Sequence, residues 1–96
     1  MSRIIWSPQA EQDLRSIRNF IARDSRQYAK RMIDRIKQAV AGCRRFPEAA
    51  AIVPEFGDPL VREMFVATYR VIYRIDGNAI HVLTVLHSAR HLRGLP

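Results

Sequence analysis

The stretch Tyr69–Leu86, YRVIYRIDGNAIHVLTVL, decides the fold that this sequence predicts. Two runs rich in Val, Ile and Tyr flank Asp76-Gly77-Asn78, and Asp-Gly between such runs is a strong signal for a β-hairpin. The two-residue loop is either Asp76-Gly77, which pairs Tyr73 with Ile80, or Gly77-Asn78, which pairs Tyr73 with Val82. The same alternatives pair Arg70 with Leu83 or with Val85.

Both registers predict the same two faces, because successive side chains of a strand point to opposite sides of the sheet. One face is predicted to join the core and comprises Tyr69, Val71, Tyr73, Ile80, Val82 and Thr84. The other face mixes basic and apolar side chains and comprises Arg70, Ile72, Arg74, His81, Leu83, Val85 and His87. A functional site is expected on this second face. Arg70 has two possible roles there, an ion pair with Glu63 on the adjacent strand or contact with a target.

Two amphipathic helices are predicted before the hairpin. Ser7 and Pro8 form a helix start, and apolar residues at helical spacing extend that helix from about Pro8 to about Ala22. A second helix begins after the polar segment 23–25 and ends near Arg45; its apolar residues are Ala29, Met32, Ile33, Ile36, Val40 and Cys43. A connection this short predicts an antiparallel helical hairpin.

Three further segments complete the predicted architecture. Arg3–Trp6 and Val61–Val66 are strands, and Pro47–Pro59 is a connecting loop. Ala79–Leu86 is apolar at nearly every position, which places it inside the sheet with Arg3–Trp6 beside it. The sequence thus predicts an α+β domain spanning residues 1–96, of order β-α-α-β-β-β. The helical hairpin packs on one face of a mainly antiparallel four-stranded sheet, and no helix covers the other face.

The net charge of +7 in 96 residues predicts an acidic partner, either nucleic acid or an acidic protein surface. The alternative is a basic surface that only aids solubility. No segment approaches the roughly 20 apolar residues of a membrane span, no apolar signal-peptide stretch opens the chain, and Cys43 is single. These features predict a cytoplasmic protein without membrane association.

Basic residues on the second helix, Arg26, Lys30, Arg31, Arg35 and Lys37, suggest a helix-turn-helix DNA reader. That motif crosses its helices steeply and follows a shorter first helix, so a solvated basic face is the preferred interpretation. His87 and His91 lie four residues apart, but no acidic residue or cysteine lies nearby to complete a set of ligands. The sequence therefore predicts no metal site and no cofactor.

Several stretches, in this order, are similar to the RelE/ParE superfamily of toxins from bacterial type II toxin–antitoxin systems. They are WSPQAEQDLRSIRNFIARDS at 6–25, FPE at 46–48, VREMFVATYRVIYRID at 61–76 and VLTVLHSARHL at 82–92. The resemblance implies a toxin that an antitoxin neutralises by wrapping a commonly acidic segment around the helical hairpin and the sheet edge. The residues expected to contact the antitoxin are Leu14, Ile17, Ile21, Met32 and Ile36.

The resemblance leaves the target open between two branches. ParE-like members poison DNA gyrase and have no known hydrolytic site; the residues expected to bind such a target are Arg70, Arg74, His87, Arg90, His91 and Arg93. RelE-like members are ribosome-dependent endoribonucleases that cut mRNA, which needs cations on the scissile phosphate and an acid or base. The residues available for that chemistry are Arg62, Arg70, His87 and His91.

The ParE-like branch is favoured, because the nuclease pattern places lysines on the middle strands. Lys30 and Lys37 are the only lysines of this chain, both lie in the second helix, and no tyrosine follows Tyr73. A third reading is a remnant that binds an antitoxin without being toxic.

Overall fold

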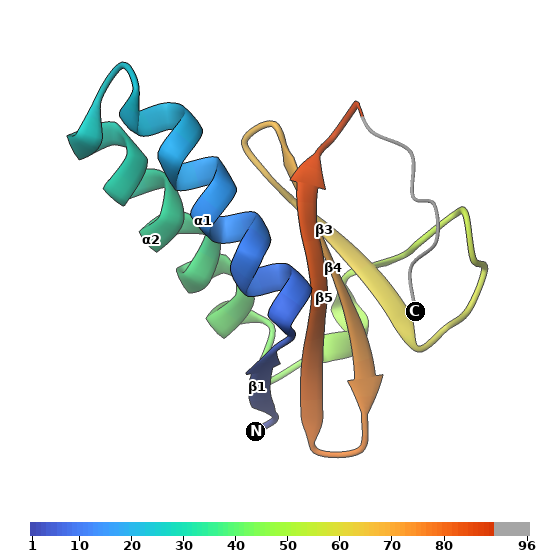
Figure 1. Ribbon diagram of the computed structural model, residues 1–96. Coiled ribbons are helices and arrows are strands. Elements are labelled where there is room, and N and C mark those ends of the chain that lie inside the picture. The colour runs from blue at the N-terminus through green and yellow to red at the C-terminus, as the bar shows by residue number, and fades with distance from the viewer. Residues whose placement is uncertain (90–96) are drawn as a thin grey trace.

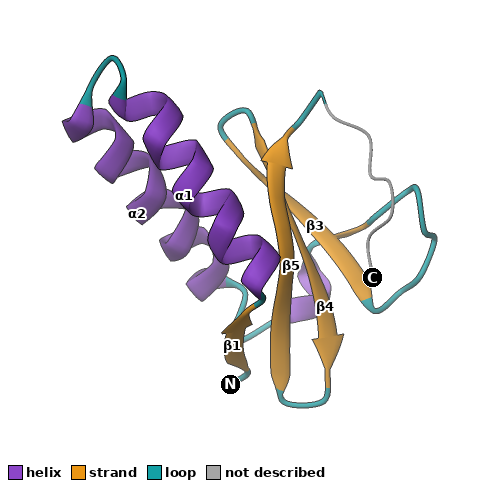
Figure 2. Cartoon of the chain, viewed as in Figure 1, coloured by secondary structure: helices purple, strands orange, loops and turns teal. Residues whose placement is uncertain are grey.

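The computed structural model describes residues 1–89, which form a helical hairpin and a sheet (Figure 1). Figure 2 shows both helices on one side of the strands. In chain order the elements are β1 (Arg3–Trp6), α1 (Pro8–Ala22), α2 (Arg26–Gly42), the 3₁₀ turn η1 (Pro47–Ala49), β2 (Ala51–Ile52), β3 (Val61–Val66), β4 (Tyr69–Asp76) and β5 (Ala79–His87).

Serine caps begin both helices, as the sequence predicts for the first. The Ser7 hydroxyl accepts a hydrogen bond from the Ala10 amide at 3.0 Å, and Ser25 does the same for Tyr28. Such caps satisfy amides that have no partner inside the helix. No helix of the described residues is long and apolar enough to cross a membrane.

The sheet is mixed and has five strands in the order β1-β5-β4-β3-β2. As predicted, β1 lies beside β5, and the pair is parallel. The prediction of four strands is wrong, because β2 lies within the expected loop and pairs antiparallel with β3. A strand of two residues between prolines is too short to show the alternation that identifies a strand.

The β4–β5 hairpin turns at Gly77-Asn78, since Asp76 pairs with Ala79. Gly77 has φ +55°, a conformation that glycine adopts without steric cost. Tyr73 therefore pairs with Val82, one of the two predicted registers.

A β-bulge beyond the Tyr73–Val82 pair changes which side of the sheet the later residues of β5 face. Ile72 pairs with Thr84 while Tyr73 pairs with Val82, so β5 carries one extra residue. Arg70 then pairs with Leu86, and not with Leu83 or Val85 as predicted. The prediction that Val85 and His87 share the face of Arg70 is also wrong. Val85 packs in the core under the helices, and His87 pairs with Tyr69.

The main core lies between the helical hairpin and the sheet. Tyr73, Val82 and Ile36 are at most 1% exposed there. A second small core lies on the opposite face, where Val53, Val61 and Ile72 pack together with Leu83 and Leu86. The loop between β2 and β3 begins at Val53, so a loop covers part of the face on which no helix was expected (Figure 1).

Candidate functional site

Arg70 lies at the centre of an ion-pair cluster on the face away from the helices. Its Nη1 and Nη2 donate to the two carboxylate oxygens of Glu55 at 2.8 and 3.0 Å. Its Nε and Nη2 donate to Oε1 of Glu63 at 3.0 and 2.7 Å. Arg70 is 6% exposed and Glu63 is 7% exposed. The guanidinium also lies 6.0 Å from the ring centroid of Phe65, its neighbour on β3.

In this cluster the charge of Arg70 is paired with carboxylates of the same chain. The hydrogen bonds that Arg70 donates to Glu55 and Glu63 raise the pKa of its guanidinium above its ordinary value, so the group stays charged. Glu55 and Glu63 both accept hydrogen bonds from the same guanidinium, so the charge of Arg70 is paired within the protein. Of the two predicted roles for Arg70, the ion pair with Glu63 is the one present in the structure, joined by Glu55 from the β2–β3 loop.

Arg62 lies on the other face of the sheet. It pairs across β3 and β4 with Tyr73, a residue of the main core, whereas Arg70 pairs with Phe65. The Arg62 guanidinium donates to the carbonyls of Pro59 at 2.7 Å, Glu48 at 2.7 Å and Ala50 at 2.9 Å. It thereby ties together the backbone on both sides of β2, and it does not converge with Arg70.

The two described histidines also lie apart. His87 packs edge-to-face on Tyr69, with ring centroids 6.1 Å apart, and its Nδ1 accepts from the Ala89 amide at 3.2 Å. Because of the bulge, His87 lies on the opposite face from Arg70. His81 pairs across the hairpin with Arg74, and its Nε2 lies 3.4 Å from Oδ2 of Asp76.

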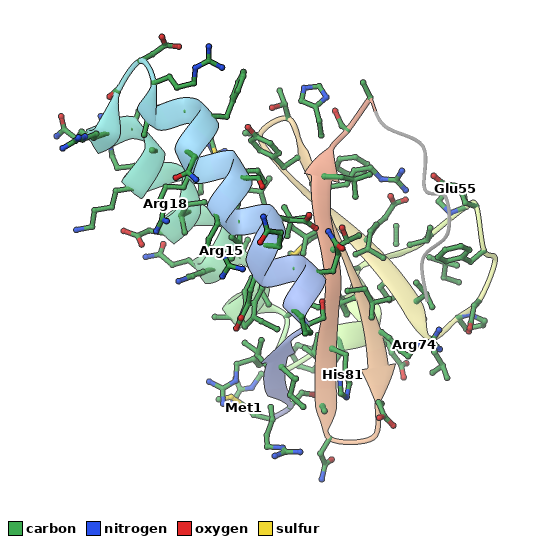
Figure 3. All side chains as sticks on the ribbon, viewed as in Figure 1. Met1, Arg15, Arg18, Glu55, Arg74 and His81 are labelled. Atoms are coloured by element: carbon green, nitrogen blue, oxygen red, sulfur yellow. The ribbon has the colours of Figure 1, made fainter. Side chains whose placement is uncertain are left out.

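Among residues 1–89, Arg74 is the predicted target-binding arginine that is accessible. Its side chain is 41% exposed and reaches Asp58 at 3.7 Å. Figure 3 labels Arg74 and His81 at the same end of the sheet. The other predicted contacts, Arg90, His91 and Arg93, lie outside the described residues.

The residues expected to contact an antitoxin form the inner side of the helical hairpin in the free chain. Leu14, Met32 and Ile36 are buried in the main core, and Ile17 and Ile21 pack against it. Their contact with an antitoxin stays a prediction. Among residues 1–89, no group of three or more His, Cys, Asp or Glu side chains is placed to hold a metal ion.

Two features were missed by the sequence reading. One is a groove of about 510 Å³ lined by Trp6, Glu11, Leu14, Arg15, Arg18, Ile33 and Lys37. Figure 3 labels Arg15 and Arg18, which come from α1. Their spacing of three residues signals a shared helix face, but only the packing of β1 and α2 beside α1 shows the groove.

The other feature is Asp13, which joins α1 to the bulged strand. Its Oδ2 accepts from the Thr84 hydroxyl and from the Val85 amide, the latter at 2.9 Å. Gln9 donates to its Oδ1 at 2.8 Å. The carboxylate thus satisfies a backbone amide next to the bulge, at a point where β5 departs from regular pairing with β4. An acidic residue on a helix gives no sequence signal for this role.

The buried hydroxyl of Tyr73 is expected to make the protein less stable at alkaline pH. Burial, above all, raises the pKa of Tyr73 above its ordinary value, and its hydroxyl donates to the Pro47 carbonyl. A group with a raised pKa in the folded state supports the fold below its unfolded pKa, about 10 for tyrosine, and loses that support as pH rises further. The free energy of unfolding, measured with urea, should therefore fall above pH ~10.

The matched variants are Tyr73→Phe and Tyr28→Phe, the second at a side chain that is 49% exposed. Tyr73→Phe should cost about 1 kcal/mol at neutral pH, for the lost hydrogen bond, and should flatten the alkaline decline. Tyr28→Phe should leave stability at neutral pH unchanged and should alter the alkaline decline less than Tyr73→Phe, because Tyr28 affects it only through the pKa of Tyr69. An equally steep decline in Tyr73→Phe would contradict this assignment.

Comparison with known proteins agrees with this geometry. Residues 4–92 match the family model of the ParE toxin of the type II toxin–antitoxin system parDE. The chain is 29% identical over 91 residues to Toxin RelE2 of Caulobacter vibrioides. The aligned region covers 94% of this chain and 99% of that protein.

Solved structures show the same fold. The chromosomal ParDE system from P. aeruginosa matches with a TM-score of 0.75 and 20% identity, covering 91% of this chain and 96% of that chain. The YoeB dimer from Staphylococcus aureus matches with a TM-score of 0.63 and 17% identity, covering 90% of this chain and 95% of that chain.

The helical hairpin on one face of a five-stranded sheet places the protein in the structural class of the ParE and YoeB toxins. Since the family model spans most of the chain, the protein belongs to the ParE toxin family, within the RelE/ParE superfamily of type II toxin–antitoxin toxins.

Proposed function

We propose that this toxin acts by binding, that its target is DNA gyrase, and that a cognate antitoxin neutralises it. One observation carries the proposal. The cations that match the nuclease pattern are committed to the fold on opposite faces: Arg70 to two carboxylates and Arg62 to three carbonyls. His87 lies on the face away from Arg70.

RNA cleavage needs cations and an acid or base within hydrogen-bond reach of one scissile phosphate. Among residues 1–89, Arg62, Arg70 and His87 do not meet at any such point. The match to the ParE family model supports the ParE-like branch. The resemblance to that branch implies gyrase poisoning without a hydrolytic site. The exposed Arg74, with His81 beside it, is the described part of the proposed target contact.

The proposed antitoxin segment fits the groove beside Trp6. The described lining of this groove combines three cations with three apolar residues and one carboxylate: Arg15, Arg18, Lys37, Trp6, Leu14, Ile33 and Glu11. An acidic segment with apolar side chains complements this lining. Among the similar solved structures are complexes of YoeB with YefM from Staphylococcus aureus, which supports an antitoxin as partner.

A second candidate function is ribosome-dependent mRNA cleavage, with the ribosome and mRNA as partners. The name of the relative Toxin RelE2 favours it. Different assays test the two candidate functions, because a gyrase poison needs neither ribosomes nor translation.

The test is inhibition of purified gyrase by the full chain. We expect loss of plasmid supercoiling and accumulation of gyrase–DNA cleavage complexes. Arg74→Glu should raise the concentration for half-inhibition roughly tenfold, which corresponds to about 1.4 kcal/mol. Arg45→Glu, the same charge change at an exposed residue outside the proposed contact, should leave that concentration within about twofold, because salt screens exposed charges that do not touch the target.

Unchanged supercoiling and cleavage complexes at excess toxin would refute the gyrase proposal. New 5′ ends on a translated message, seen by primer extension, would then favour the second candidate. Gyrase inhibition without such ends would exclude it as the main activity.

A further inference from the structure

We propose that the outer face of α2 is a docking surface for the phosphate backbone of duplex DNA. This inference rests on the proposed function in one respect: a gyrase poison meets the DNA that gyrase holds. The outer face is defined by the cations Arg26, Lys30, Arg31, Arg35 and Lys37, which are all exposed.

These cations are available for a partner. The three arginine–carboxylate ion pairs formed among the described residues, and the contact between His81 and Asp76, lie on the sheet and its loops. None of them uses a cation of α2. Asp34 is the single acidic residue of the helix, against five cations. In Figure 1, no other described element lies over α2 on the side away from the sheet.

The cations form two rows along the helix. With 3.6 residues per turn, Arg26, Lys30 and Lys37 follow one flank, and Arg31 and Arg35 follow the other. The first row runs from Arg26 to Lys37, a rise of about 16 Å at 1.5 Å per residue. Gln27, Asp34 and Gln38 lie exposed between the rows. The two glutamine amides can donate to phosphate oxygens, as side chains commonly do, and the single carboxylate of Asp34 is outnumbered by the five cations.

The composition of this face favours duplex DNA over a peptide. Protein partners need apolar or aromatic anchors at the centre of an interface. The outer face has no large apolar side chain between its two rows; the apolar residues Met32, Ile33 and Ile36 are buried toward the core. Contact with a phosphate backbone needs only charge and hydrogen bonds.

Single-stranded nucleic acid fits less well for a similar reason. Proteins bind single strands by stacking bases on exposed aromatic rings. Tyr28 is the one aromatic residue of α2, and it lies outside the two rows. It lies near Tyr69 on β4: burial raises the pKa of the Tyr69 phenol most, and Tyr28 raises it further. The antiparallel hairpin also lacks the steep crossing of a helix-turn-helix, so the expected binding is independent of DNA sequence.

The test measures binding of the full chain to a short labelled duplex of mixed sequence by fluorescence anisotropy, without gyrase. If the five cations each neutralise one phosphate, the logarithm of the association constant should fall with the logarithm of salt concentration with a slope of about −4.5. Arg31→Gln/Arg35→Gln should reduce this slope by about 1.8 and weaken binding at ~0.1 M salt roughly 60-fold.

The control is Arg3→Gln/Arg45→Gln, which lowers the net charge equally at two exposed residues outside α2. It should change affinity by no more than about threefold, because the screening length at ~0.1 M salt is about 10 Å. Both variants should unfold at the temperature of the parent chain. An equal loss in the two variants would overturn the inference, since bulk charge would then explain binding. Tighter binding to a single strand or to an acidic peptide would overturn it as well.

The outcomes separate this inference from the proposed function. Gyrase inhibition by a chain that does not bind the duplex would refute the docking surface and leave the proposed function standing. Duplex binding that depends on Arg31 and Arg35, without gyrase inhibition, would do the reverse.

Discussion

Replacing Arg70 by alanine should lower the free energy of unfolding by about 3–5 kcal/mol, the effect of removing one partner from a buried ion pair. The change would leave the 7%-exposed Glu63 without the guanidinium that pairs with it and would remove the ion pair between Arg70 and Glu55 of the β2–β3 loop. Urea unfolding followed by circular dichroism measures the loss. Reduced toxicity of this variant would therefore report lost fold, and not a lost catalytic group.

Two further variants test the reason given for that loss. Arg74→Ala removes an exposed cation whose contact with Asp58 is 3.7 Å long, and should cost less than about 1 kcal/mol. Arg70→Met/Glu63→Met removes both buried partners and should recover much of the stability that Arg70→Ala loses, because no buried charge is left unpaired. If the double variant is no more stable than Arg70→Ala, the explanation by an unpaired carboxylate is wrong.

Asp13→Ala is expected to destabilise the protein by about 3 kcal/mol. Hydrogen bonds to a charged group each contribute about 1.5–3 kcal/mol, and Asp13 accepts from both Thr84 and Val85. The variant leaves the Val85 amide without its acceptor beside the bulge. The loss should appear both in urea unfolding and in faster hydrogen exchange of the Val85 amide, because local protection there depends on this contact.

The control for this prediction is Asp34→Ala, which removes an exposed carboxylate from α2 and should stay within about 0.5 kcal/mol of the parent chain. Asp13→Asn keeps one oxygen acceptor and should fall between the two. Protection of the Val85 amide that is unchanged in Asp13→Ala would show that α1 does not hold the bulged strand.

The elements that carry their own periodic pattern could be predicted from the sequence. These elements are local, because each depends on residues within a few positions of one another. They include the cap and apolar spacing of α1, the limits of β3 and the hairpin signal at Asp76-Gly77-Asn78. The position of β1 beside β5 could also be predicted, because β5 is apolar at nearly every position and such a strand needs neighbours on both sides.

The candidate site was less predictable, because its residues depend on contacts between distant segments. Arg70 and Glu63 could be paired from adjacent strands, but Glu55 joins them only through the path of the β2–β3 loop. Arg62 matches a basic position of the nuclease pattern, yet its three carbonyl partners come from both sides of β2, a strand too short to predict.

The family could be predicted from the sequence because four stretches, in order, resemble the RelE/ParE superfamily. The helical hairpin and the face of the sheet on which Tyr73 lies followed from apolar periodicity, which is a local property of each segment. Which basic residues can meet a partner depends instead on contacts that form only in the folded chain. One extra residue in β5 turns His87 away from Arg70, and two carboxylates neutralise Arg70. Register and ion pairing are set by packing energy between segments far apart in the chain, which no local pattern records.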